Sequence, residues 1–172
     1  FCKALDVFDP APGRDNSYPE RMMSYYYIKA LSKALPRAHV FLEFPIAGRS
    51  KRGWDNHIDA LIFNDEELIA AEFKVAWAPT HWLDLAKDLE RLQGPSVARD
   101  IRNGFKVHRR RSYIFLGSDC WHERKAENWK SGSQSGRWTL PTTLLSAYRD
   151  SVCVYPDKGK DYEGYHLTWA LL

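Results

Sequence analysis

The stretch IDALIFNDEELIAAEFKVAW, residues 58–77, predicts a β-hairpin at the centre of a sheet. Residues 58–64 and 68–77 are rich in β-branched and other apolar side chains, as buried strands are. The polar sequence NDEE at 64–67, which separates them, is typical of a tight turn. The two runs are therefore expected to pair in antiparallel fashion.

The length of this turn sets the register of the hairpin. If Asn64 pairs with Glu67, Asp59 lies directly opposite Glu72, with Cβ atoms roughly 5 Å apart. Lys74 shares a face with Glu72, because side chains alternate along a strand. Two acids and a lysine are thus expected on one surface of the sheet.

Opposed carboxylates destabilise a strand pair, and burial raises the cost, so this arrangement calls for a compensating cation. Mg²⁺ prefers oxygen ligands and commonly takes one or two protein carboxylates, which makes Asp59 and Glu72 suitable ligands. The ammonium group of Lys74 would then orient an attacking water and stabilise charge on phosphoryl oxygens. The alternative is a surface charge cluster, but the acids interrupt strands that are apolar on both faces.

Flanking patterns place this hairpin in an α/β chain. Helical or strand periodicity, bounded by proline, glycine and polar breaks, predicts the following elements: a helix over 17–35, a strand over 40–46, a helix from 79–80 to 94–95, a strand over 111–117, a short helix over 142–148 and a strand over 165–172. We expect one domain over 1–172, with a core at about 17–117 and a variable part over 118–172.

This order of elements, with Asp59 followed after twelve residues by Glu72-Phe73-Lys74, resembles the PD-(D/E)XK nuclease superfamily. The resemblance covers residues 17–117, and Ile58 stands where the family name has proline. It implies a three-layer restriction-endonuclease-like core of the order helix-strand-strand-strand-helix-strand, with a mixed central sheet and additional C-terminal elements.

The resemblance also implies roles for individual residues. Asp59 and Glu72 would bind Mg²⁺ or Mn²⁺, the carbonyl of Phe73 would add a ligand, and Lys74 would assist the water. Some members place a first-helix glutamate at the metal, which here would be Glu20. A second interpretation of Glu20 is equally open: it would complete a capping box at the start of the helix.

Basic residues are unevenly distributed along the chain. The segment 99–137 carries ten Lys and Arg against four Asp and Glu, a charge of +6, whereas the rest of the chain is −3. This asymmetry suits contact with a phosphate backbone, although a solvated charged face would give the same pattern. The residues expected to bind nucleic acid are Arg49, Lys51, Arg52, Lys87, Arg109, Arg110 and Arg111.

Three side chains near the hairpin have two interpretations each. His57 lies on the strand face of Asp59 and would either touch substrate or be structural. Lys87 and Arg91 lie one turn apart on the second helix, where they would reach phosphate or pair with acids of the same helix. Pairing within the helix is the more common arrangement.

Composition sets the broad class of protein. The chain has 172 residues, of which 44% are hydrophobic and 27% charged, and no apolar run approaches the roughly 20 residues that a membrane-spanning helix needs. Three widely spaced cysteines do not suggest a disulfide framework, so we expect a cytoplasmic protein that does not contact membranes.

The expected activity is a metal-dependent endonuclease that hydrolyses phosphodiester bonds. DNA is favoured over RNA through the resemblance alone, and a homodimer would suit double-strand cleavage. One alternative is a module that binds nucleic acid or a protein with little or no turnover. Another is an acid/base hydrolase of a different kind, for which paired carboxylates would also serve.

Overall fold

The computed structural model describes residues 20–46, 57–75, 80–105, 111–120, 123–133, 139–155 and 165–172. Its elements, in chain order, are α2 (Glu20–Ala34), β1 (His39–Pro45), β2 (His57–Phe63), β3 (Glu67–Lys74), α3 (Thr80–Leu92), α4 (Pro95–Phe105), β4 (Arg111–Cys120), α5 (Glu123–Ser131), the 3₁₀ helix η1 (Thr142–Leu144), β5 (Tyr148–Tyr155) and β6 (Tyr165–Leu171). The α/β class expected from the sequence is confirmed.

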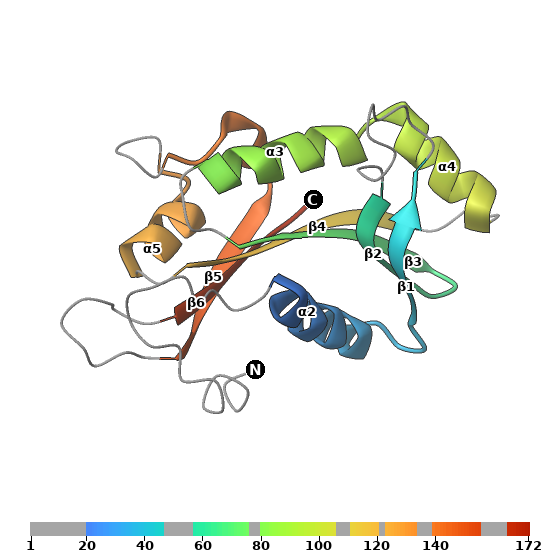
Figure 1. Ribbon diagram of the computed structural model, residues 1–172, viewed down its shortest axis with the longest axis horizontal. Helices are drawn as coiled ribbons and strands as arrows, with labels where there is room; N and C mark the ends of the chain where they lie inside the picture. Colours follow the sequence, from blue (N-terminus) through green and yellow to red (C-terminus); the bar gives the residue numbers. More distant parts are fainter. Residues whose placement is uncertain are drawn as a thin grey trace.

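The strands form one mixed sheet in the order β1-β2-β3-β4-β6-β5. Strands β1, β2 and β3 are antiparallel neighbours, and β4 is parallel to β3. The chain crosses between these two parallel strands through α3 and α4 (Figure 1). Strands β6 and β5 continue the sheet in antiparallel fashion, so only the β3–β4 pair is parallel within the described residues.

Helix α2 covers one face of the sheet (Figure 1). Met23 and Tyr27, four residues apart on one side of the helix, are buried against Phe73 and Phe115 of the strands. The Tyr27 hydroxyl donates to the backbone carbonyls of Ser118, at 2.7 Å, and Thr168, at 2.9 Å. Because these carbonyls belong to β4 and β6, the tyrosine ties the helix to two strands.

Helix α3 covers the opposite face, together with α4, α5 and η1 (Figure 1). Its apolar residues recur every three or four positions and are all buried: Trp82, Leu85, Ala86, Leu89 and Leu92. This spacing aligns them in one stripe along the helix, as an amphipathic helix requires. Helix α3 therefore lies flat on the sheet, and its neighbouring polar residues reach the strand ends beside it.

Three elements were not predicted from the sequence: α4, α5 and β5. The predicted helix end near Gly94-Pro95 is confirmed, since α3 ends at Leu92, but a new helix, α4, begins at Pro95, because proline is favoured as the first residue of a helix. The helix expected over 142–148 is wrong beyond residue 144, because η1 has three residues and β5 begins at Tyr148.

The remaining predicted elements are confirmed where they are described, with ends displaced by a few residues. Strand β4 is longer than expected and continues to Cys120. Across the described residues, every helix is too short or too polar to cross a lipid bilayer.

Candidate active site

The β2–β3 hairpin has the register predicted from its turn. Ala60 pairs with Ala71, and the Asn64 amide donates to the Glu67 carbonyl at 3.0 Å. The side-chain oxygen of Asn64 also accepts from the amides of Glu66 and Glu67, which stabilises the turn locally. One further step along the ladder brings Asp59 opposite Glu72.

Asp59 and Glu72 interact across this pair of strands. The Phe73 amide donates to Oδ2 of Asp59 at 2.8 Å, which fixes the carboxylate against β3. Burial raises the pKa of Asp59, and the Phe73 amide, Glu72 and the charge of Lys74 offset only part of that effect. Asp59, Glu72 and Lys74 therefore belong to one electrostatic cluster at the end of the hairpin strands.

Glu72 is the most deeply buried member of this cluster, with 2% of its surface exposed. Burial, together with the neighbouring Asp59, raises its pKa from an ordinary 4.5 to about 9, although Arg91 acts in the opposite direction. The Phe73 side chain, one residue along, packs on the other face against α2. Beyond it, the Ser118 hydroxyl donates to the Lys74 carbonyl at 2.7 Å, which secures the end of β3.

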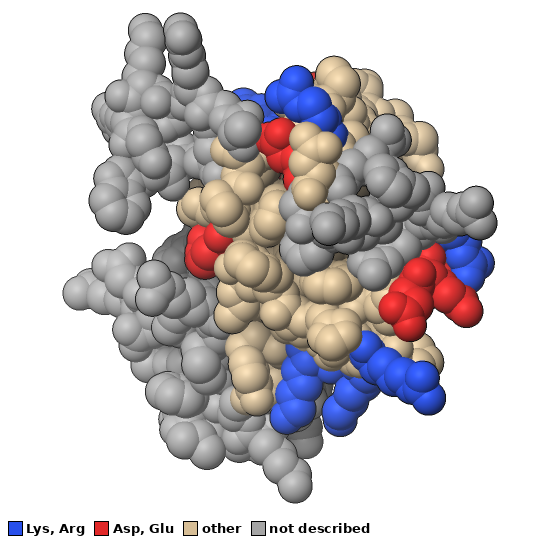
Figure 2. Space-filling view, turned by 90° about the vertical axis from the view of Figure 1, so that its right-hand side faces the viewer, with Lys and Arg blue, Asp and Glu red and all other residues tan. Residues whose placement is uncertain are grey.

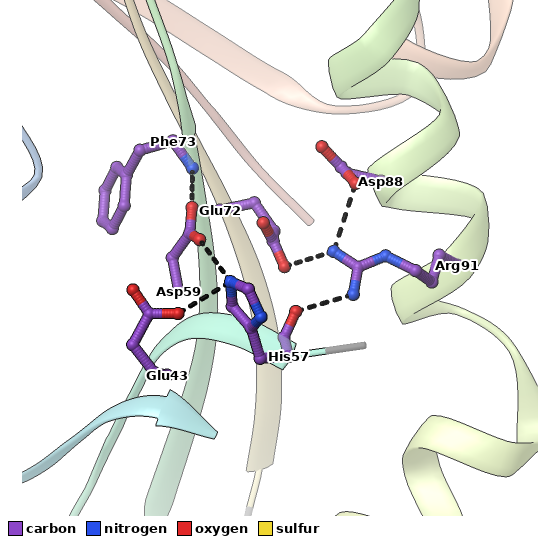
Figure 3. Close-up of polar contacts among 7 residues, drawn as sticks. All are labelled: Glu43, His57, Asp59, Glu72, Phe73, Asp88 and Arg91. Carbon is purple, nitrogen blue, oxygen red and sulfur yellow. Dashed lines mark hydrogen bonds and ion pairs between the residues drawn. The ribbon is translucent and has the colours of Figure 1, made fainter. Parts of the chain in front are cut away.

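Arg91 of α3 binds Glu72 from the helix side. Figure 3 shows its guanidinium reaching from the helix to the strands, where it donates to Glu72 and, at 2.8 Å, to the backbone carbonyl of His57. The same group also contacts Asp88, one turn back on α3, at 3.1 Å. The guanidinium thus supplies positive charge on one side of the Glu72 carboxyl.

Glu43 and His57 complete the cluster on the other side of Asp59. The β1–β2 register, with Leu42 opposite Ala60 and Phe44 opposite Ile58, brings Glu43 into line with Asp59. A Glu43 carboxylate oxygen lies 2.7 Å from Nε2 of His57, which in turn is 3.9 Å from Oδ1 of Asp59 (Figure 3). Three acids, at positions 43, 59 and 72, therefore form a row across β1, β2 and β3.

The charges of this cluster do not balance among the described residues. Four carboxyl groups lie in this cluster, those of Glu43, Asp59, Glu72 and Asp88, beside the basic side chains of Arg91 and Lys74 and the imidazole of His57. With all four carboxyl groups, Arg91 and Lys74 charged and His57 neutral, the partly buried site would carry an excess of two negative charges. Burial is the main reason that the pKa of both Asp59 and Glu72 is raised, and the neighbouring carboxyl groups, Glu43 for Asp59 and Asp59 for Glu72, add to it. A divalent cation would remove the excess negative charge, and oxygen and imidazole donors are suitable ligands for one.

The residues predicted to contact nucleic acid are only partly described. Arg49, Lys51, Arg52, Arg109 and Arg110 lie outside the described residues. Glu20 is the first residue of α2, but its side chain is outside them too, so both of its interpretations stay predictions.

Lys87 and Arg111 are described, and both form ion pairs. Lys87 lies 2.8 Å from Asp84 of the same helix, the pairing expected from its spacing. Arg111 lies 3.1 Å from Glu67, which it faces across the β3–β4 register. That register runs seven residues further before it reaches Lys74, a separation of about 23 Å along the strands. Arg111 is thus distant from the acid cluster, whereas Lys87 is one helical turn from Arg91.

The face at the hairpin end of the molecule has no continuous basic surface over the residues described there. Figure 2 shows Lys and Arg side chains in separate small groups on this face, some beside Asp and Glu. An exposed ion pair, such as that of Lys87 with Asp84, contributes little energy, so its cation is still able to contact a phosphate.

Sequence analysis did not identify Glu43 as a member of the cluster, and for Arg91 it favoured a contact within its own helix. Glu43 interrupts the apolar run VFLEF at 40–44, the same signal that singled out Asp59 and Glu72, but no local turn sets its register. Arg91 was expected to pair within its helix, which it does through Asp88, yet its contact with Glu72 depends on how α3 lies on the sheet.

In comparisons with known proteins, no family model, no curated protein and no solved structure matches the chain.

Proposed function

We propose that the protein is a metal-dependent nuclease of the restriction-endonuclease-like type, which hydrolyses phosphodiester bonds in DNA. The observation that carries this proposal is the hairpin register, which aligns Asp59 with Glu72 and leaves Lys74 two residues further on the same strand. The order of α2, the three antiparallel strands, the crossover helices and the parallel strand β4 is compatible with that core.

The residues of the cluster are suited to a divalent cation. Asp59 and Glu72 present carboxylate oxygens, the donors that Mg²⁺ and Mn²⁺ accept, and the carbonyl of Phe73 lies between Glu72 and Lys74 on the same strand. When bound, such an ion stabilises charge on the phosphoryl oxygens and lowers the pKa of a bound water. Such an ion would also offset the charge of the neighbouring carboxyl groups, which supports the proposal.

The protein's own side chains would perform the remaining tasks. Asp59 is held by the Phe73 amide, so one carboxylate oxygen is oriented before any ligand arrives. Lys74 is partly exposed at the strand end, where its ammonium would orient the attacking water and stabilise the negative charge that develops as the P–O bond to the leaving oxygen breaks. Arg91 would hold Glu72 in position from the helix side.

The test is a cleavage assay on plasmid, linear and single-stranded DNA and on RNA, with Mg²⁺, Mn²⁺ or chelator. Asp59→Asn, Glu72→Gln and Lys74→Ala should each lower the cleavage rate by about 100-fold or more, because each removes a group that acts on the transition state. Glu67→Gln and Lys130→Ala are matched controls elsewhere in the fold and should retain activity. Cleavage that survives both chelator and the three substitutions would refute the proposal.

One observation favours a second candidate, a module that binds nucleic acid or protein without turnover. Arg91 already supplies a positive charge to Glu72, which partly replaces the charge of a metal. DNA binding that is independent of metal, with no cleavage of any substrate, would support this alternative.

A further inference from the structure

Asp59 has a second set of partners on the side away from Glu72. The donor atoms of Glu43, His57 and Asp59 all lie within 4.8 Å of one another. They come from two hydrogen-bonded strands, and their side chains converge in the close-up (Figure 3). The nuclease proposal uses a different set of ligands, in which Asp59 acts with the buried carboxylate of Glu72 and the carbonyl of Phe73. In the present set, Asp59 acts with an imidazole and an exposed carboxylate.

The spacing of these atoms is close to what a shared ion needs. Two ligands bound to one ion at about 2.1 Å can be no more than about 4.2 Å apart. The observed limit of 4.8 Å exceeds this by a few tenths of an ångström. Glu43 is exposed over 65% of its side chain and His57 over 39%, so both can shift by that amount at little cost.

Two backbone features hold the ligands in this arrangement. Glu43 has a φ of 51°, a left-handed conformation that is unusual for glutamate within a strand and that changes the direction of its side chain. The carbonyl of His57 accepts a hydrogen bond from Arg91 at 2.8 Å, which anchors the backbone that carries the imidazole. His57 and Asp59 then point to the same face, two residues apart on β2.

Arg91 approaches Glu72 from the side away from Asp59 (Figure 3). Its guanidinium contacts Glu72, Asp88 and the His57 carbonyl, all on the α3 side of the cluster. On the side of Asp59 that faces Glu43 stands the imidazole of His57, 2.7 Å from Glu43 and 3.9 Å from Asp59. A metal ion would therefore meet less competition from the guanidinium on the β1 side of Asp59.

We infer that Glu43, His57 and Asp59 form a metal site that takes a first-row transition ion such as Mn²⁺ in preference to Mg²⁺. Imidazole is a better ligand for first-row transition ions than for Mg²⁺, which prefers oxygen donors, so the histidine favours a transition ion at this site. The inference rests on the proposed function only because both use Asp59. Through Asp59, the ion would lie next to the water and phosphate that Glu72 and Lys74 are proposed to bind.

The test is Mn²⁺ binding to the metal-free full chain, followed by electron paramagnetic resonance with echo detection of directly bound ¹⁴N. We expect one Mn²⁺ with nitrogen modulation in the parent protein. His57→Ala should abolish the modulation, and His57→Ala and Glu43→Gln should each raise the Kd for Mn²⁺ roughly 10-fold or more, the effect of losing a ligand or its support. His39→Ala, which changes an exposed histidine at the other end of β1, should alter neither.

Several results would overturn the inference. They are bound Mn²⁺ without nitrogen modulation, modulation that persists in His57→Ala, an unchanged Kd in both site variants, or no Mn²⁺ binding by the parent protein. Thermal melts of each variant control for misfolding. Because Glu43 is exposed and His57 only half-buried, the variants are expected to melt at temperatures close to that of the parent protein.

Cleavage assays distinguish a failure of the proposed histidine site from a failure of the nuclease proposal. Cleavage that needs Asp59 and Glu72, with no nitrogen bound to Mn²⁺, would reject the histidine site alone. Nitrogen-bound Mn²⁺ with no cleavage of any nucleic acid would reject the nuclease function alone.

Discussion

Replacing Glu72 with glutamine should stabilise the metal-free protein increasingly as the pH rises. The pKa of Glu72 is raised from 4.5 to about 9 in the folded protein, chiefly by burial and by the neighbouring Asp59. Between these two values the folded state binds more protons at this residue than the unfolded state, so its stability falls as the pH increases. The slope for one such group is at most about 1.4 kcal/mol per pH unit.

The assay is urea denaturation in the presence of chelator between about pH 6 and about pH 8. The free energy of unfolding of Glu72→Gln, relative to the parent protein, should increase by up to about 3 kcal/mol over this interval. Glu67→Gln is the control, because it removes a carboxyl from the same strand but one exposed over 25% of its side chain. A Glu72→Gln difference that does not vary with pH would refute the reasoning, since it would mean that Arg91 keeps Glu72 ionised throughout.

Three further substitutions test the packing around the site. Arg91→Met should cost about 1–3 kcal/mol of unfolding free energy in urea titrations, because Glu72 loses a charged donor, and less in a Glu72→Gln background. Tyr27→Phe should cost about 1–2 kcal/mol in the same measurement, because two backbone carbonyls lose a buried hydroxyl; an unchanged stability would show that the hydroxyl does not tie α2 to the sheet. Gly117→Ala should lower the melting temperature, by an amount equivalent to about 1–3 kcal/mol, because its Cβ would lie 2.7 Å from the Phe73 ring and 3.0 Å from that of Tyr27; a higher melting temperature would contradict this.

The alternation of side chains and a short turn made the centre of the site predictable. The register of β2 and β3 follows from the turn at residues 64–67, because a short connection permits few pairings. Asp59, Glu72 and Lys74 could therefore be related to one another by counting. The apolar stripe of α3 was equally local, since its spacing of three and four residues is visible within thirteen positions.

The tertiary structure decided which groups surround that centre. Glu43 meets Asp59 across β1 and β2, whose connection of more than ten residues sets no register by itself. Arg91 reaches Glu72 because α3 packs on the sheet at one particular depth and angle, which depend on the whole apolar core beneath the helix. The sequence by itself thus determined the two acids and the lysine, because their relation is set by neighbours along the chain. The charged groups around those acids, Arg91 and Glu43, were placed only by the packing of separate elements, because side chains distant in sequence come into contact only when the core forms.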